Sequence, residues 1–319
     1  MFKKLIISIL CFFISLNAFA QDGKMVDKKR IVFADTAAER VAKKFPDSDV
    51  KTILEKVDFY WITYLSDGLK VRAILAEPKG EGRFPAIIYN RGGNRDFGKI
   101  TEGFALGHLG VLARAGYVVV GSQYRGNDGG EGADEFGGAD VNDVLNLIPF
   151  LNAHPKVDSS AIGMTGTSRG GMQTCLALKK TDKIKAALIN SGAANSFTVL
   201  KDRLDFEVSV YRKVIPNYDA TKDSALRARS PVFWAEKICK TTPILLLHGT
   251  ADWRVSTEEA LELAQQFYRT KQPFRFVLYE GDVHGLWEHE VEVNDLTIRW
   301  FDDYLKKKKP LPNLVLHGK

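Results

Sequence analysis

Six short apolar segments recur along the chain, and they alternate with longer stretches that have helical periodicity. The apolar segments span residues 85–90, 117–124, 161–166, 185–190, 243–249 and 274–280. The helical stretches span residues 141–152, 172–180, 256–268 and 293–305. Strands that are apolar on both faces and alternate with helices form parallel sheets covered on both sides. The sequence therefore predicts an α/β fold with a mostly parallel central sheet and helices on both faces.

Two further strand-like segments precede this pattern. Residues 56–65 and 69–78 are joined by Ser66, Asp67 and Gly68. An Asp-Gly pair between two such segments is a strong signal of a β-hairpin. We therefore expect an N-terminal antiparallel hairpin at one edge of the otherwise parallel sheet.

Residues 195–230 interrupt the alternation, because they separate two predicted strands by more than an ordinary crossover needs. Ligands bind at the carboxyl ends of the strands in sheets of this kind. The segment therefore predicts a small helical cap over the site. Its aromatic residues suit an apolar pocket, although core packing explains any one of them equally well; they are Phe197, Phe206, Tyr211 and Tyr218.

The first twenty residues, "MFKKLIISILCFFISLNAFA", have a basic start, an apolar run and a final A-x-A. This is the layout of a secretory signal peptide, and we expect cleavage after Ala20 and export to the periplasm or the medium. A membrane anchor is the alternative, but the apolar run is short and a polar segment follows it at once. Residues 21–50 are interpreted as a charged N-terminal extension that leads into a helix. Residues 51–319 are interpreted as one catalytic domain.

The charge pattern gives no sign of a nucleic-acid partner. The net charge is +6, and removal of the two leader lysines leaves 6 − 2 = +4. Four of the positive charges form the run Lys306–Lys309, which is typical of a solvated helix end. No basic stripe is interleaved with aromatic residues. No cluster of histidine and cysteine has metal-ligand spacing, and we expect neither a metal nor a cofactor.

Two cysteines, Cys175 and Cys239, follow the predicted leader. Export would permit a disulfide between them, but two cysteines do not make a disulfide framework. We favour two buried thiols that act as small hydrophobic side chains.

The segment Gly166-Thr167-Ser168-Arg169-Gly170 matches G-x-S-x-G. It lies between a predicted strand and a predicted helix, which is the context of a nucleophile elbow. Glycines are needed there because side chains would collide with the strand and the helix. The pattern predicts that Ser168 is a nucleophile, and that the backbone N–H of Arg169 donates to an oxyanion.

A serine nucleophile needs a base and an orienting acid, which follow it in the order acid, then histidine, in this fold. His284 comes directly after the segment 274–280. The other five histidines precede every suitable acid, begin the last predicted helix or lie near the C-terminus. Asp252 follows the segment 243–249 and is the predicted acid. Asp282 is a rival acid, but it lies two residues from His284 and is interpreted as a loop residue.

The oxyanion site needs a second donor. The segment "YNRGGNRDFG" follows the apolar segment 85–90, and its glycines allow the backbone to approach a substrate oxygen. We expect this donor to be a backbone N–H near Arg91 or Gly92. A plain Gly-Gly turn is the alternative.

The motifs "GTSRGG", "HGTADWRV" and "GDVHG" resemble, in the same order, the three catalytic motifs of the prolyl oligopeptidase family. The segments "QYRGNDGGEG", "GGADVNDV" and "RSPVFWAEKI" resemble further family segments, and the resemblance covers about residues 55–305. It implies a serine hydrolase of α/β-hydrolase fold that acts mainly on peptides or acyl-amino substrates. It also implies that Arg254, two residues after the acid, holds a substrate backbone carbonyl; a surface arginine is the alternative.

Two departures from the family bear on the substrate. We expect no β-propeller before the catalytic domain, because few residues precede it. Arg91 stands where family members place Tyr or His before Gly-Gly, so a tyrosine hydroxyl is missing from the oxyanion site. An exported peptidase or acyl-amino hydrolase is the first function predicted, and a carboxylesterase or deacetylase with the same triad is the alternative. A catalytically inactive binding protein is a third reading, against which the complete triad argues.

Overall fold

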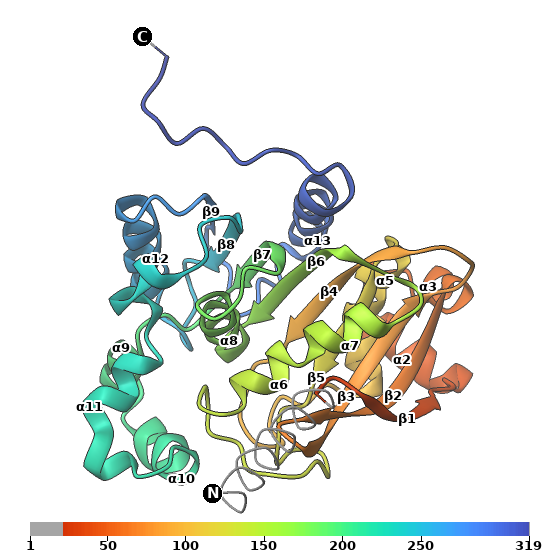
Figure 1. Ribbon diagram of the computed structural model, residues 1–319, viewed down its shortest axis with the longest axis horizontal. Helices are drawn as coiled ribbons and strands as arrows, with labels where there is room; N and C mark the ends of the chain where they lie inside the picture. The colour runs from red at the N-terminus through yellow and green to blue at the C-terminus, as the bar shows by residue number, and fades with distance from the viewer. Residues whose placement is uncertain (1–21, 319) are drawn as a thin grey trace, which may run out of the picture.

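The computed structural model describes residues 22–318, and the predicted signal peptide lies outside the described residues. The described chain contains a nine-stranded sheet of order β1-β2-β3-β5-β4-β6-β7-β8-β9 (Figure 1). Its strands are β1 (Met25–Arg30), β2 (Val57–Ser66), β3 (Leu69–Pro78), β4 (Phe84–Asn90), β5 (Val118–Ser122), β6 (Val157–Thr167), β7 (Ile184–Asn190), β8 (Ile244–Gly249) and β9 (Phe274–Tyr279). The pairs β1–β2, β2–β3 and β3–β5 are antiparallel, and every other neighbouring pair is parallel. All six predicted apolar segments are strands of this sheet.

Helices cover both faces of the sheet, as predicted. One face packs against α6 (Val141–Leu145), α7 (Leu147–Ala153), α8 (Arg169–Leu178) and α12 (Thr257–Arg269). The other face packs against α2 (Asp35–Lys44), α3 (Val50–Lys56), α4 (Glu102–Phe104), α5 (Gly110–Arg114) and α13 (Glu290–Phe301). Successive strand residues point to opposite faces: Ile87 belongs to the second core and Ile88 to the first. The central strands are therefore apolar throughout, because both of their faces are buried.

The predicted hairpin is β2 and β3, paired from Val57 with Pro78 to Ser66 with Leu69. Its two turn residues, Asp67 and Gly68, both have positive φ (52° and 78°). A turn of that shape matches the twist of an antiparallel pair, and Asp-Gly adopts it readily.

The sequence did not indicate β1. All six of its residues, "MVDKKR", are exposed, and it pairs only with β2 among the described strands. Charged side chains on an edge strand prevent pairing with other chains, and they also erase the alternation that reveals a strand. The segment 21–50 is therefore more than a linker, because Ile31 and Phe45 are buried in the second core.

The segment 195–230 is a helical insertion between β7 and β8, as predicted. It contains α9 (Ser196–Asp202), the π-helical turn η3 (Glu207–Tyr211), α10 (Arg212–Val214) and α11 (Tyr218–Ala228). Figure 1 shows these helices projecting to one side of the sheet, beyond α8. We call residues 195–230 the cap.

Cys175 and Cys239 are both free thiols. Cys175 is buried, but Cys239 is partly exposed, so the expectation of two buried thiols is wrong for Cys239. The Cys239 side chain lies on the loop before β8, where its sulfur is 3.1 Å from Thr241 Oγ1. None of the helices within residues 22–318 is long and apolar enough to cross a bilayer.

Candidate active site

Ser168 occupies a sharp turn between β6, which ends at Thr167, and α8, which begins at Arg169. Its φ is +60° and its ψ is −126°, a strained conformation for a residue with a side chain. A Cβ atom on Gly166 or Gly170 would overlap neighbouring backbone, at the Gly170 and Asn90 carbonyls respectively. The glycines of the motif are therefore needed for the close contact of strand, turn and helix.

Asp252 and His284 lie side by side on the loops after β8 and β9. Their hydrogen bond joins His284 Nδ1 and Asp252 Oδ2 over 2.7 Å. Asp252 Oδ1 accepts the N–H groups of Arg254 (2.8 Å) and Val255 (3.0 Å). Burial alone would raise the pKa of Asp252, but the His284 contact and these amides hold it below the usual value. The carboxylate is therefore ionised and fixed opposite the imidazole.

One cavity of about 300 Å³ is lined by Ser168, His284, Gly92 and Arg254. These residues follow β6, β9, β4 and β8, so the cavity lies at the carboxyl ends of the parallel strands. The structure thus brings the sequence-predicted residues to one place. Within residues 22–318, no group of three or more acidic, histidine or cysteine side chains could hold a metal ion.

The predicted oxyanion loop passes directly beside the nucleophile. A Cβ atom on Gly92 would lie 3.1 Å from Ser168 Cβ, so only a glycine lets the backbone come this close. The side chain of Arg91 is buried and turned away from Ser168. It donates to the carbonyl oxygens of Gln123 (2.8 Å) and Arg95 (2.6 Å). Arg91 therefore holds the loop in place, and Arg91 and Gly92 can contribute a donor only through their backbone.

In Arg169, as in Arg91, the side chain and the backbone have different roles. Its guanidinium is buried and pairs with Asp134 (2.6 Å) and Asp140 (2.7 Å). It also stacks on the rings of Tyr124 and Phe136, at 4.9 and 4.5 Å from their centroids. The side chain therefore fixes the loop that follows β5 beneath the cavity. The backbone N–H of Arg169, the first of helix α8, is the group left to face a ligand.

Asp282, the rival acid, has a different partner. Its carboxylate accepts hydrogen bonds from His289 Nδ1 (2.9 Å) and from the backbone N–H of Val283 (2.7 Å). It therefore ties the loop that carries His284 to the start of α13. The sequence interpretation of Asp282 as a loop residue agrees with this geometry.

His248 is a neighbour of the acid that sequence reasoning missed. Its Nε2 lies 3.0 Å from the Val255 carbonyl oxygen and 3.4 Å from Asp252 Oδ2. Burial lowers the pKa of His248, so the neutral ring donates from Nε2. The sequence signal for this contact is the short spacing of His248 and Asp252 within "HGTADWRV". His248 lies in β8 and Asp252 lies in the short loop directly after it, so the two side chains stay close.

Two of the four cap aromatics reach the cavity. Phe206 and Tyr211 line it together with Phe136 from the body, and the three rings pack edge to face with centroids 5.1–5.9 Å apart. Phe197 instead packs on Phe233, and Tyr218 packs behind Tyr211. The pocket interpretation is thus correct for Phe206 and Tyr211, and the core-packing interpretation is correct for Phe197 and Tyr218.

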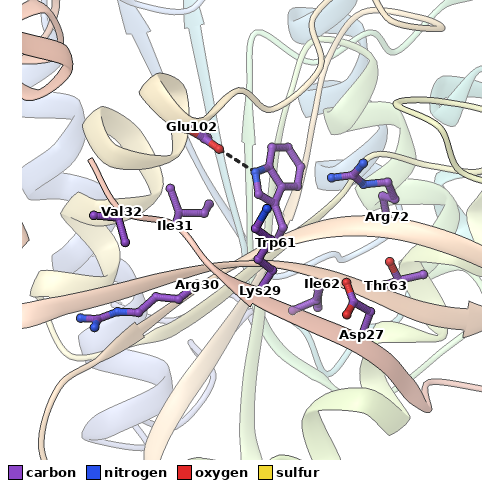
Figure 2. Close-up of a pocket in the computed structure, with 10 residues that line it drawn as sticks. All are labelled: Asp27, Lys29, Arg30, Ile31, Val32, Trp61, Ile62, Thr63, Arg72 and Glu102. Carbon is purple, nitrogen blue, oxygen red and sulfur yellow. Dashed lines mark hydrogen bonds between the residues drawn. The ribbon is translucent and has the colours of Figure 1, made fainter. Parts of the chain in front are cut away.

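A second hollow, of about 670 Å³, lies beside β1 and β2 at the antiparallel edge (Figure 2). Trp61 crosses it, donating from Nε1 to Glu102 Oε1 (2.8 Å) and lying 4.7 Å from the Arg72 guanidinium. None of the sequence-predicted site residues lines it. We therefore assign the chemistry to the Ser168 cavity.

The sequence profile of the prolyl oligopeptidase family matches residues 104–308. The chain is 30% identical over 231 residues to the "Uncharacterized peptidase YtmA" of Bacillus subtilis, covering 72% of this chain and 87% of that protein. It is 26% identical over 243 residues to the acylamino-acid-releasing enzyme of Sus scrofa, covering 70% of this chain and 32% of that protein.

The fold is also that of a solved peptidase. The acylaminoacyl peptidase of Pyrococcus horikoshii superposes with a TM-score of 0.69 at 22% identity, over 83% of this chain and 44% of that one. The chain thus spans less than half of this structure and about a third of the pig enzyme. The match to the family profile covers well over half of the chain, and it contains Ser168, Asp252 and His284. The chain therefore belongs to the prolyl oligopeptidase family and is a serine hydrolase of the α/β-hydrolase fold.

Proposed function

We propose that the chain is an exported serine peptidase that cleaves peptide or acyl-amino bonds through Ser168, His284 and Asp252. The observation that carries this proposal is the 2.7 Å contact between His284 and Asp252, together with a strained serine that lines the same cavity as His284. Relatives that are named acylamino-acid-releasing enzyme and dipeptidyl-peptidase 5 support this substrate class.

The proposed reaction is acyl transfer to water. With Nδ1–H donating to Asp252, His284 Nε2 is the base that takes the proton of Ser168 Oγ as this oxygen attacks the substrate carbonyl. Asp252 stabilises the imidazolium, which then protonates the leaving amine. Water, deprotonated by the same His284, hydrolyses the acyl-enzyme and releases Ser168.

Backbone N–H groups of Arg169 and of the Arg91-Gly92 loop are the proposed oxyanion donors. The close approach of Gly92 to Ser168 supports this assignment. Losing one such donor typically costs about 2.7–4 kcal/mol of barrier. The Tyr124 hydroxyl is not such a donor, because Tyr124 is buried and donates to the Arg91 carbonyl oxygen (3.0 Å).

Labelling with a fluorophosphonate tests the nucleophile. We expect the wild type to be labelled and Ser168→Ala to stay unlabelled, while Ser191→Ala, which removes a nearby buried hydroxyl, keeps its label. Equal labelling of wild type and Ser168→Ala would contradict the assignment of Ser168 as the nucleophile.

The substrate class needs a panel of aminoacyl-naphthylamides and short acyl esters. We expect turnover of both, because an acyl-enzyme forms from amides and esters alike. Turnover of esters alone would assign the chain to the carboxylesterase or deacetylase alternative.

Export is tested by the mass of the protein recovered outside the cytoplasm. We expect a chain that begins at Gln21. Recovery of a full-length chain bound to the membrane would favour an anchor instead.

A further inference from the structure

The cavity beside Ser168 has a marked imbalance of charge. Among the described residues that line it, five carry a permanently cationic side chain and none carries a carboxylate. The five are Arg91, Lys99, Arg169, Arg203 and Arg254.

Three of these cations are already engaged within the protein. Arg91 donates to backbone carbonyl oxygens, and Arg169 pairs with Asp134 and Asp140. Lys99 Nζ lies 2.9 Å from Asp128 Oδ1. Carboxylates thus neutralise Arg169 and Lys99, whereas the N–H groups of Arg91 are all engaged by backbone carbonyl oxygens and hold its loop in place.

Arg203 and Arg254 are different, because their side chains contact only aromatic rings among the residues that the structure describes. The Arg254 guanidinium carbon lies 4.8 Å from the Trp253 ring centroid, and that of Arg203 lies 5.9 Å from the same centroid. Arg203 also lies 4.5 Å from the centroid of Phe206. No hydrogen bond or ion pair joins either guanidinium to another residue in the part of the chain from 22 to 318.

The two arginines come from separate parts of the fold. Arg254 lies on the loop after β8, two residues from Asp252, and Arg203 directly follows α9 in the cap. Trp253, 67% exposed, lies within reach of both. Two cations that share one ring without a counter-ion repel each other, and an anion between them would relieve that repulsion.

We propose that Arg203 and Arg254 form an anion subsite that binds a carboxylate of the substrate, next to the bond that Ser168 attacks. The guanidinium fork matches the two oxygens of a carboxylate, and stacking on Trp253 fixes the plane of the fork. A neutral carbonyl needs one donor, whereas two uncompensated guanidinium groups select a full negative charge. The inference rests on the proposed hydrolase function, and it means that the enzyme prefers substrates that carry a carboxylate.

The carboxylate has two sources, the acyl side or the leaving side of the scissile bond. For the acyl side, N-succinyl-phenylalanine p-nitroanilide is compared with its N-acetyl analogue. For the leaving side, N-acetyl-phenylalanyl-glycine with a free carboxylate is compared with its C-terminal amide. We expect kcat/KM to be higher for the anionic member of one pair by about tenfold or more, since a charge-assisted hydrogen bond is worth at least that factor.

Variants then connect this preference to the two arginines. In the double variant Arg203→Gln with Arg254→Gln, we expect kcat/KM to fall by about tenfold more for the anionic member of the pair than for its neutral analogue, so that the preference disappears. Arg227→Gln is the matched control, because Arg227 of the cap also stacks on two rings, those of Phe197 and Phe233, but lies outside the cavity lining. It should keep the full preference.

Three results would overturn the proposal: no anionic preference in the wild type, a preference that survives in the double variant, or an equal loss for anionic and neutral substrates. Calorimetric titration of Ser168→Ala with the same four compounds measures the affinity for each compound in the absence of turnover. A chain that hydrolyses none of them refutes the proposed function, whereas equal affinity for anionic and neutral compounds refutes the subsite.

Discussion

The loops at the strand ends and the cap form opposite sides of one cavity, yet they are built differently. Ser168, Asp252 and His284 stand on loops whose backbone is tied down by hydrogen bonds, such as Ser168 N–H to the Asn190 carbonyl oxygen (3.0 Å). The cap has exposed apolar residues, including Leu204 at 80% and Val208 at 58%. Many of its ion pairs lie at the surface, such as Arg212 with Asp219.

The difference separates two tasks. Reacting groups must be held to a fraction of an ångström, and strand ends in a buried sheet provide that rigidity. Specificity depends on shape and charge, which a helical insertion varies without disturbing the sheet. We therefore expect substitutions at the strand ends to act on kcat or on folding, and substitutions in the cap to act on KM.

The largest expected effect is that of Asp252→Asn. An amide at this place favours the wrong tautomer of His284, and kcat should fall by about 10⁴-fold. Asp282→Asn is the matched control, because it removes the rival acid from the same loop cluster. Its effect on kcat should be far smaller, and a reversal of this order would move the acid to Asp282. Steady-state kinetics on an activated ester measures both.

The next effect concerns stability. Arg169→Met leaves Asp134 and Asp140 buried without their partner, and the free energy of unfolding should fall by about 3–5 kcal/mol. Arg227→Met removes an exposed pair with Asp223 and the stacking on Phe197 and Phe233, and should lower the free energy of unfolding by about 1 kcal/mol or less. Denaturant titrations compare the two, and similar losses would contradict the proposed contrast between strand ends and cap.

A smaller effect is expected in the aromatic wall. Phe206→Ala removes one ring of this wall. An aromatic pair is worth about 0.5–1.5 kcal/mol, so losing one ring contact with the substrate should raise KM for apolar acyl substrates several-fold with kcat nearly unchanged. Phe197→Ala, a cap ring outside the cavity, is the control and should leave KM as it is. Equal KM in both variants would mean that the substrate does not contact this wall.

A fourth effect links the cap to pH. Glu259 of α12 accepts the N–H groups of Ala194 (2.8 Å) and Asn195 (2.7 Å), where the cap begins. Burial raises the pKa of Glu259 to about 8, above the ordinary value of 4.5. The folded state therefore holds this proton more tightly than the unfolded state, and the resulting stability is lost as the pH rises from 4.5 to 8.

Glu259→Gln keeps the acceptor oxygen and removes the titration. Over pH 5 to 8, we expect the Tm of the wild type to fall relative to that of the variant. Parallel Tm curves over this range would show that Glu259 is ionised in the folded state.

Much of the fold and of the candidate site followed from local patterns. The uninterrupted apolar segments predicted the central strands because both faces of each strand are buried. The Asp67-Gly68 pair predicted the hairpin because two positive φ angles are needed there. The glycines around Ser168 predicted a strained turn, since strand, turn and helix meet with no room for side chains.

Features that depend on distant partners were not predictable in this way. The strand β1 carries the charges of a protected edge, so its pattern resembles that of a linker. The buried ion pairs of Arg169 join a helix to a loop about 30 residues earlier, and nothing in the sequence distinguishes Arg169 from a surface arginine. The same holds for Arg203, whose importance comes only from sharing Trp253 with Arg254.

The sequence by itself determined the order of the elements, the strained serine turn and the loops that carry an acid and a histidine, because each depends on spacing and backbone conformation within a short stretch. The tertiary structure alone decided which charges are neutralised. Lys99 and Arg169 are paired with carboxylates of the loop after β5, whereas Arg203 and Arg254 have no carboxylate partner among the described residues. Charge compensation depends on which segments meet in space, and a linear pattern carries no record of that.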